Sequence, residues 1–312
     1  MNQSASSPGT GDDLSALAWV HDELRRSLET AHKALRRHLE AFPDGQCAGA
    51  TLRYAVEPEP LDTAGAIRFA AEAADIDDTF VVANGDVLTD LDVASLVAFH
   101  RSRQAEATLH LMAVDDPSAF GVVGLDADGR IECFVEKPAP GTEPSNLVNA
   151  GTYVLEPSVL DAIPLGQKCS IERVTFPLLV ERGAAFGMAT DDYWIDTGKP
   201  GLYLSANLDL LDGTRPGSHC EGVHHEASVD PAAAVHTSVV GAGAQVAAGA
   251  VVERSVVLAG AHVHTGAKVS GSVIMGEVLA DAVVIDSVIG ADAVVAAGEH
   301  VHAERRPDPT AA

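Results

Sequence analysis

The sequence of 312 residues predicts an α/β domain that is followed by a parallel β-helix. Strand and helix signals alternate over residues 50–212, which indicates an α/β domain with a mostly parallel sheet. Residues 229–301 instead repeat one short pattern of Val, Ala and Gly, as the coils of a β-helix do. The boundaries that we expect are a disordered tail at 1–12, the α/β domain at 13–222, the β-helix at 223–303 and a second disordered tail at 304–312.

Composition and charge exclude several classes of protein. Acidic residues number 45 and basic residues 20, and the net charge of −25 argues against nucleic-acid binding and against docking on anionic membranes. No apolar run approaches the roughly 20 residues of a membrane helix, and the polar, acidic start is unlike a signal peptide. We expect no disulfide scaffold and no structural zinc, and we expect a cytoplasmic protein, because the cysteines are far apart and form no CxxC. They are Cys47, Cys133, Cys169 and Cys220.

Residues 13–41 are predicted to form one long helix, because apolar side chains recur along them at steps of three and four. The Pro and Gly of the segment 42–45 then end this helix. Its apolar stripe must pack on something, and we expect it to cover the open sheet or a second copy of the chain.

The α/β segment contains the expected elements in alternation. The expected strands are 52–56, 79–83, 107–114, 121–125, 130–135 and 149–155, and the expected helices are 63–74, 91–103 and 170–182. The run 79–83 is short and apolar, as a buried parallel strand should be. The strands at 121–125 and 130–135 flank a Gly-containing turn and therefore predict a hairpin.

The β-helix prediction rests on a fixed period. Ser-Val-Val begins at Ser238 and Ser255, and Ser-Val-Ile begins at Ser272 and Ser287, so the offsets between units are 17, 17 and 15 residues. Apolar residues fall six apart within a unit, which is a hexapeptide repeat with one inward side chain per strand. The short last offset indicates that the final turn lacks two residues. The unpaired edges of an end coil favour a homo-oligomer that assembles through the β-helix.

Two aspartates follow apolar segments. Asn84-Gly85-Asp86 comes directly after an expected strand, and ligands of open α/β sheets sit beyond the carboxyl ends of strands. An Asp oxygen at such a place can hold Mg²⁺. Asp196 follows Tyr193-Trp194-Ile195, so it is expected to be partly buried and to need a cation or a hydrogen-bond partner. The alternatives are a plain turn at Asp86 and a helix cap at Asp196.

Two further motifs could bind polar or anionic groups. Glu136 and Lys137 end a strand, where the carboxylate can accept from sugar hydroxyls and the ammonium can neutralise a phosphate. A solvated surface pair is the alternative. The segment 61–65 opens a helix, and its backbone amides could face an anion or a base edge. Asp62 or Thr63 as a plain N-cap is the alternative there.

Seven motifs precede the repeats: EPEPLDTAGA (57–66), VVANGDV (81–87), FGVV (120–123), FVEKP (134–138), NAGTYV (149–154), SIERVTFP (170–177) and DYWIDTGKP (192–200). In this order the chain resembles the nucleoside-diphosphate-sugar pyrophosphorylases, and most closely the mannose-1-phosphate guanylyltransferases, over about residues 42–303. The resemblance implies a Rossmann-like nucleotidyltransferase domain that is followed by a left-handed parallel β-helix.

The resemblance also implies a reaction, in which a sugar 1-phosphate attacks the α-phosphate of a nucleoside triphosphate in line and pyrophosphate leaves. The implied substrates are GTP and a hexose 1-phosphate, with GDP-mannose as the product and glucose 1-phosphate as the alternative sugar. The implied cofactor is Mg²⁺, shared by Asp86 and Asp196, and Lys137 is the third implied catalytic residue. The resemblance further places Glu136 on sugar hydroxyls, Lys137 on the sugar phosphate, Asn149, Gly151 and Gly121 in the sugar pocket, and Thr63, Ala64 and Gly65 near the nucleobase.

The chain departs from the family pattern in two places. The family opens with a strand and a Gly-rich loop, G-x-G-T-R-L-x-P-L-T, which this sequence does not contain, so we expect the domain to lack its first strands. The expectation is a mis-started or disrupted enzyme gene, with two alternatives: a non-catalytic or truncated homologue that binds nucleotide sugars as a regulatory subunit, or a site that another subunit completes. The family also usually has Gly where this chain has Asp62, and an acid there could reshape the base pocket.

Overall fold

The computed structural model describes residues 35–36, 39–217 and 220–307. The predicted tail 1–12 and most of the predicted helix 13–41 lie outside these residues. Residues 39–41 are helical and the helix ends before Phe42, as predicted. The chain divides into two compact units, residues 1–82 with 93–189 and residues 83–92 with 190–312.

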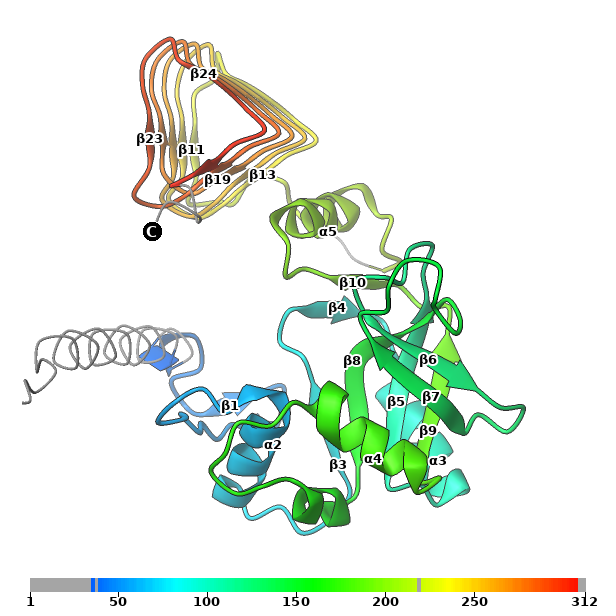
Figure 1. Ribbon diagram of the computed structural model, residues 1–312. Helices are drawn as coiled ribbons and strands as arrows, with labels where there is room; N and C mark the ends of the chain where they lie inside the picture. Colours follow the sequence, from blue (N-terminus) through cyan, green and yellow to red (C-terminus); the bar gives the residue numbers. More distant parts are fainter. Residues whose placement is uncertain (1–34, 37–38, 218–219, 308–312) are drawn as a thin grey trace, which may run out of the picture. The chain divides into compact units, whose positions relative to one another are not determined.

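The first unit is built on a six-stranded sheet of strand order β7-β6-β8-β5-β9, with β3 paired to β8 (Figure 1). Its strands are β3 (Phe80–Ala83), β5 (Ala107–Ala113), β6 (Gly121–Leu125), β7 (Ile131–Glu136), β8 (Leu147–Leu155) and β9 (Ala185–Thr190). Its helices are α2 (Asp62–Ala73), α3 (Val93–Arg103), the 3₁₀ turn η1 (Pro157–Ala162), the π-helical turn η2 (Ile171–Thr175) and α4 (Phe176–Glu181). A separate small hairpin joins β1 (Gln46–Cys47) and β2 (Ala50–Thr51).

The helices and most strands of this unit are confirmed, but the predicted directions of the strands are not. The pairs β5–β8, β6–β7 and β6–β8 are all antiparallel, whereas the alternation of elements predicts a mostly parallel sheet. The β6–β7 pair is the hairpin that the sequence predicts, since so short a connection joins antiparallel strands, and the pairs β5–β8 and β6–β8 are the ones that depart from the prediction.

One predicted strand is absent, and a second is present but less buried than predicted. Residues 52–56 form no strand: the N–H of Leu52 donates to Gly45 O at 2.8 Å beside the β1–β2 hairpin, and among the described strands none pairs with the rest of the segment. The run predicted as a buried strand is β3, but its residues alternate between half-buried and exposed, and Val81 is 41% exposed. Among the described strands β3 pairs only with β8, so it does not occupy a covered central position.

The core of the first unit lies where the sheet meets α2 and α4. Leu109 and Leu111 of β5 are fully buried, and so is Phe176 at the start of α4. Phe176 packs edge-on against Tyr153 of β8, with ring centroids 5.0 Å apart, and also contacts Phe134 of β7 at 5.5 Å. These aromatic contacts fix the segment η2–α4 on the strands that carry the predicted sugar-binding residues.

The second unit contains a strand pair, a helix and a parallel β-solenoid. The antiparallel strands are β4 (Val87–Thr89) and β10 (Trp194–Asp196), and the helix is α5 (Pro200–Asp212). Pro200 occupies the first turn of α5, where its missing N–H costs nothing. Gly213 ends the helix in the left-handed conformation, at φ 81°.

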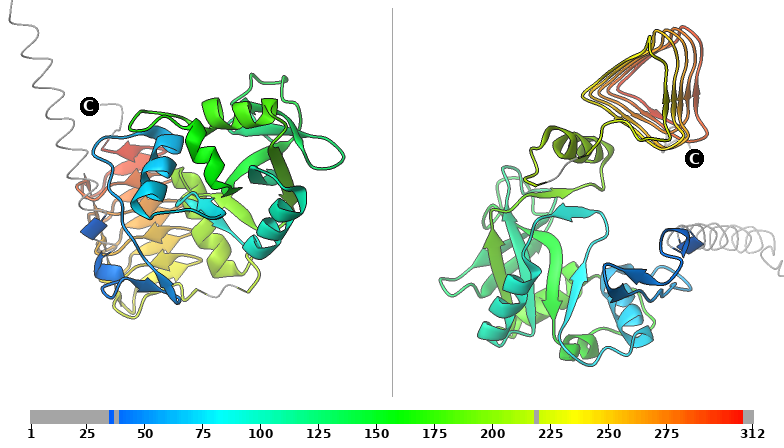
Figure 2. Two further views of the ribbon diagram at one scale, coloured as in Figure 1. Left: turned by 90° about the horizontal axis from the view of Figure 1, so that it is seen from below. Right: turned by 180° about the vertical axis from the view of Figure 1, so that it is seen from behind.

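The solenoid has three parallel sheets of five strands, which form the sides of a triangle in cross-section (Figures 1 and 2). One sheet holds β11 (Ser228–Val229), β14 (Gln245–Val246), β17 (His262–Val263), β20 (Glu277–Val278) and β23 (Val294–Val295). The second holds β12 (Ala234–His236), β15 (Val251–Glu253), β18 (Lys268–Ser270), β21 (Val283–Ile285) and β24 (His300–His302). The third holds β13 (Val239–Val240), β16 (Val256–Val257), β19 (Val273–Ile274), β22 (Val288–Ile289) and β25 (Arg305–Arg306).

The interior of the solenoid confirms the hexapeptide prediction. The apolar residues six apart, such as Val240, Val246 and Val252, are buried in one continuous core. Ser238, Ser255, Ser272 and Ser287 form a buried ladder along one corner. Each hydroxyl donates to the backbone oxygen two residues earlier at 2.6–2.8 Å. Each hydroxyl also accepts the backbone N–H at the equivalent position of the next coil, at 3.0–3.1 Å. The repeated serine therefore gives this buried N–H a hydrogen-bond partner in every coil.

The predicted position of the two-residue deletion is wrong. The shortened coil has one further coil of normal length after it, because β22 pairs with β25 and Val288 faces Arg305. The deletion falls at Met275-Gly276, the corner between β19 and β20, where two residues replace four. A Cβ at Gly276 would collide with the backbone oxygens of Gly290 and Ala293, so the short corner requires glycine.

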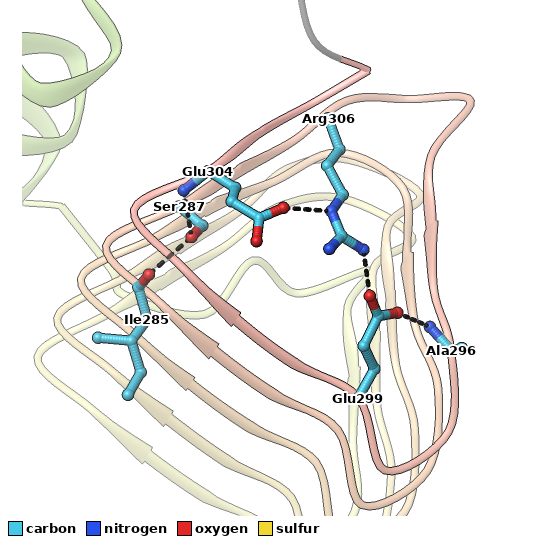
Figure 3. Close-up of polar contacts among 6 residues, drawn as sticks. All are labelled: Ile285, Ser287, Ala296, Glu299, Glu304 and Arg306. Atoms are coloured by element: carbon cyan, nitrogen blue, oxygen red, sulfur yellow. Dashed lines mark hydrogen bonds and ion pairs between the residues drawn. The ribbon is translucent and has the colours of Figure 1, made fainter.

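The solenoid also extends past the predicted end at residue 303. β25 continues the third sheet, and Arg306 crosses the open end of the last coil (Figure 3). Its guanidinium contacts Glu299 at 2.7 Å and Glu304 at 2.8 Å. β25 is the last strand among the described residues, and charged residues replace the Val-Val pattern there, as in a polar capping repeat.

Two exclusions from composition can be compared with the structure. All four cysteines are free, as predicted. In the part of the chain that the structure describes, no helix has the length and apolar character needed to cross a bilayer.

Candidate functional site

The second unit brings two carboxylates together at the end of the β4–β10 pair. Asp196 ends β10 and lies opposite Val87, the first residue of β4, so Asp86 is one residue away. The backbone N–H and the hydroxyl of Thr197 both donate to the backbone oxygen of Asp86, each at 2.8 Å. These bonds fix the turn that carries Asp86 against the strand that carries Asp196.

Gly198 marks the space between these two carboxylates. Its N–H donates to Asp196 Oδ1 at 2.8 Å. A Cβ on Gly198 would lie 3.0 Å from Asp196 Oδ1 and 3.0 Å from Asp86 Oδ2, so the two oxygens are separated by at most twice that distance. Two carboxylates facing a gap that only glycine leaves open form a donor set of the kind Mg²⁺ prefers.

The alternatives for the two aspartates have different outcomes. Asn84 to Val87 does form a turn, so Asp86 occupies a turn as well as the carboxylate pair. Asp196 does not cap the following helix, because the N-cap of α5 is Lys199 and no side chain caps it. The carboxylate of Asp196 is therefore directed to Gly198 and not to the first turn of α5.

In the first unit, Gly121 and Glu136 lie opposite each other in the β6–β7 hairpin. A Cβ on Gly121 would lie 3.0 Å from Glu136 Oε2 and would collide with the ring of Phe134. Glycine at this position therefore lets the carboxylate of Glu136 lie over the backbone of β6. Burial raises the pKa of Glu136, the charge of Glu172 raises it further, and the charges of Lys137 and Arg173 act in the opposite direction.

Lys137 follows directly and adopts a left-handed backbone conformation, at φ 49°. Its N–H donates to the backbone oxygen of Phe120 at 2.9 Å, which ties the turn to the start of β6. Its ammonium lies 3.8 Å from Glu136 Oε1 and is 61% exposed. Glu136 is 20% exposed, so the pair presents an accessible cation beside a half-buried carboxylate. A non-glycine residue at positive φ is strained, and such strain concentrates at functional positions.

Asn149 and Gly151 lie in a β-bulge of β8. Leu109 and Leu111 of β5 face Tyr153 and Asn149, so β8 carries two extra residues between these pairs. Gly151 adopts φ 77° within the bulge, and its N–H donates to Asn149 Oδ1 at 3.1 Å. Asn149 Nδ2 donates to the hydroxyl of Tyr153 at 2.9 Å. Bulges redirect side chains next to active sites, and this one aims Asn149 along its own strand.

The first turn of α2 differs from one expectation. The N–H groups of Ala64 and Gly65 both donate to the backbone oxygen of Cys169, at 2.8 and 3.2 Å. The N–H of Thr63 donates to Asp62 Oδ1 at 3.0 Å. The amides of Ala64 and Gly65 are therefore engaged by the protein itself, which contradicts the expectation that they could face an anion or a base edge. That Thr63, Ala64 and Gly65 lie near a nucleobase stays a prediction.

Asp62 itself is held at φ 61°. This is the left-handed region that glycine adopts freely and that an aspartate adopts at a cost. The N-cap of α2 is Leu61, without a side-chain cap, so Asp62 is not a plain N-cap. The family usually has glycine at this position, and the backbone conformation of Asp62 is one that favours glycine.

The sequence analysis did not identify two residues that contact predicted site residues: Glu172, which contacts Thr63, and Tyr153, which contacts Asn149. Glu172 accepts the hydroxyls of Thr63 and Ser170, at 2.8 and 2.9 Å. Tyr153 is buried under the bulge, and burial raises its pKa. Both residues lie in family motifs, SIERVTFP and NAGTYV. An acid in a helical turn and a tyrosine in a strand nevertheless give no local signal of a binding site.

One other group of described residues has donors for a metal ion. His224, His225 and Glu226 place three such atoms within 4.8 Å of one another. His224 Nδ1 already accepts the N–H of Glu226 at 3.2 Å, and two of the three residues are exposed. The Asp86–Asp196 pair is therefore the better candidate for a metal in the predicted reaction.

The comparisons with known proteins agree with the motif order. A family model described as nucleotidyl transferase matches residues 26–213, and a model described as GlmU-like, C-terminal hexapeptide matches residues 223–311.

A mannose-1-phosphate guanylyltransferase of Mycobacterium tuberculosis is 39% identical over 214 residues, which are 66% of this chain and 59% of that protein. A mannose-1-phosphate guanyltransferase of Candida albicans is 38% identical over 60% of this chain and 54% of its own length. A mannose-1-phosphate guanylyltransferase catalytic subunit beta of Xenopus tropicalis is 33% identical over 69% of this chain and 56% of its own length. The chain thus spans between half and three fifths of the length of these relatives.

Proposed function

The chain belongs to the nucleotidyl transferase family, and from this premise we propose that it transfers a guanylyl group from GTP to mannose 1-phosphate. The products are GDP-mannose and pyrophosphate. The relatives named mannose-1-phosphate guanylyltransferase or guanyltransferase support the choice of base and sugar.

The observation that carries the proposal is the convergence of Asp86 and Asp196 on Gly198. Residues far apart in the sequence meet there because β4 pairs with β10, and both supply the hard oxygen donors that Mg²⁺ takes. We assign Mg²⁺ to these two carboxylates. When bound, the ion supplies charge neutralisation for the triphosphate.

The other residues act by binding and orientation. Glu136 accepts hydrogen bonds from sugar hydroxyls, and the exposed ammonium of Lys137 neutralises the phosphate of the sugar. Asn149, Gly151 and Gly121 shape the pocket for the sugar ring. No nucleophilic side chain is needed, since the attacking atom is an oxygen of the sugar phosphate and catalysis is positioning plus charge stabilisation.

The test is GDP-mannose formation by the full chain, with Asp86→Asn and Asp196→Asn as variants. Asp191→Asn, an exposed carboxyl before β10, is the matched control. We expect each site variant to lose at least about a hundredfold in kcat/KM, which is about 2.7 kcal/mol of transition-state stabilisation, and the control to match the wild type. Turnover that is unchanged in either site variant would remove that residue from the metal site. A wild-type chain that binds GDP-mannose but makes none would instead be a nucleotide-sugar-binding regulatory subunit.

A further inference from the structure

The segment 169–173 is tied to the first turn of α2 by a dense set of hydrogen bonds. Cys169 donates its N–H to Leu61 O at 2.9 Å, and its carbonyl accepts from two amides of α2. Ile171 N–H donates to the hydroxyl of Thr63 at 2.8 Å. Thr63 in turn donates to Glu172 Oε2. The conformation of the 61–65 motif therefore depends on contacts with a segment far along the chain.

Glu172 is the one charged member of this set. Its Oε2 atom receives two hydroxyls, from Thr63 and from Ser170. Ser170 also accepts the N–H of Arg173 at 3.2 Å, so the turn that presents Glu172 is itself fixed. Hydrogen bonds to a carboxylate are stronger than those between neutral groups, so Glu172 adds a charge-assisted link to the bonds that join the two segments.

Glu172 also acts electrostatically on Glu136. The packing of Phe176 on Phe134 holds η2 and α4 against β7, the strand that ends in Glu136. Of the charged groups that act on Glu136, Glu172 repels its negative charge, and Lys137 and Arg173 attract it. A glutamine side chain could accept the same two hydroxyls without the repulsion that the charge of Glu172 exerts on Glu136. Acceptance of the hydroxyls alone therefore does not explain a carboxylate at this position.

We propose that Glu172 is a positioning residue of the site, whose carboxylate fixes the first turn of α2 through Thr63 and places a second negative charge on the segment that packs against β7, the strand of Glu136. Carboxylates on two elements that pack together favour a ligand that donates several hydrogen bonds, as sugar hydroxyls do. The inference rests on the proposed function for the identity of the ligand, but its two physical consequences can be measured without any ligand.

The first measurement is hydrogen–deuterium exchange of the full chain, with Glu172→Ala and Glu172→Gln as variants. Glu181→Gln, an exposed acid in α4, is the control. Alanine removes the acceptor, so we expect amides of residues 61–67 to exchange at least about tenfold faster. Glutamine keeps an acceptor oxygen, so exchange there should stay within about threefold of the wild type. Exchange that is unchanged in the alanine variant overturns the proposal.

The second measurement is the titration of Glu136 by carboxyl NMR in the same proteins. Both Glu172 variants remove a negative charge, so the pKa of Glu136 should fall in both, while the control leaves it unchanged. If Glu172 were a structural anchor alone, its variants would change the exchange and leave the pKa of Glu136 unchanged. That result would contradict the proposed effect of the Glu172 charge on Glu136. If Glu172→Ala does not fold, Thr63→Val removes the same link with a side chain of similar shape, and unchanged exchange in that variant overturns the proposal.

Assays of GDP-mannose binding and formation distinguish a failure of the proposed function from a failure of the role proposed for Glu172. A wild-type chain that neither binds GDP-mannose nor makes it refutes the proposed function, while exchange and titration still decide the role of Glu172. A chain that makes GDP-mannose, but whose Glu172 variants change neither exchange nor titration, refutes the role of Glu172 alone.

Discussion

Gly198 offers the sharpest test of the carboxylate pair, because alanine there adds one methyl group in the gap between the two acids. The new Cβ would lie 3.0 Å from an oxygen of Asp86 and 3.0 Å from an oxygen of Asp196. This is tighter than an ordinary carbon–oxygen contact, so one or both carboxylates must move by a few tenths of an ångström. Gly198 has no positive φ, so alanine brings no backbone strain.

The expected effect is large on metal binding and small on stability. Mg²⁺ holds its oxygen ligands at 2.0–2.1 Å in near-ideal octahedral geometry, so a shift of a few tenths of an ångström is a large error in that geometry. We therefore expect Gly198→Ala to weaken divalent-ion binding at least about tenfold, or about 1.4 kcal/mol. Because Gly198 is exposed, the free energy of unfolding should change by less than about 1 kcal/mol.

The assay is a Mn²⁺ titration followed by water-proton relaxation, with Mg²⁺ as competitor and urea unfolding in parallel. Gly201→Ala is the matched control, because Gly201 is also exposed and a Cβ there meets nothing within 4 Å. Equal Mn²⁺ affinity in Gly198→Ala, in the control and in the wild type would refute the reasoning.

Three further predictions concern stability. Ser255→Ala leaves the buried N–H of Ser272 without its partner and should cost about 2–4 kcal/mol in urea unfolding, whereas a cost below about 1 kcal/mol would contradict the serine ladder. Asp62→Gly relieves a residue held at φ 61° and should stabilise the chain by about 0.5–1 kcal/mol in the same assay, so a less stable variant would show that the aspartate is not strained. The hydrogen bond with His100 is the main reason that the pKa of Glu156 is below its ordinary value of 4.5 in the folded chain. The stability that Glu156 contributes is therefore present above pH 4.5 and lost as the pH falls through its folded pKa. Glu156→Gln should flatten this acid-induced loss in urea unfolding measured between about pH 5 and 3, and an unchanged pH dependence would contradict the assignment.

The solenoid could be predicted in detail because each coil repeats the same environment. Val240, Val246 and Val252 fall six apart in the sequence and face one core in the structure. The position of the deletion could not be predicted, since an offset of 15 residues does not show which corner is short. Only the pairing of strands places it at Gly276. The strand at 305–306 was missed because Arg305 and Arg306 break the apolar pattern of the repeats.

The candidate site was predictable only where a single strand end or turn carries the residue. Asp86 and Glu136 follow expected strands, and the rule that ligands bind beyond strand ends points to them directly. Glu172 could not be found in this way, because its role depends on a hydroxyl more than a hundred residues away, at Thr63. The amides of 64–65 were misjudged for the same reason, since their partner is the carbonyl of Cys169. Contacts of this kind are set by tertiary packing and leave no trace in local sequence.

The most direct test of the central claim is a substrate panel with the full 312-residue chain. Each nucleoside triphosphate is supplied in turn with mannose 1-phosphate or glucose 1-phosphate and Mg²⁺, and the nucleotide sugars and pyrophosphate are quantified. We expect GTP with mannose 1-phosphate to give GDP-mannose and pyrophosphate in equal amounts, at a higher kcat/KM than any other pair. A folded chain that forms no nucleotide sugar from any pair, or that prefers another base and sugar, would contradict it.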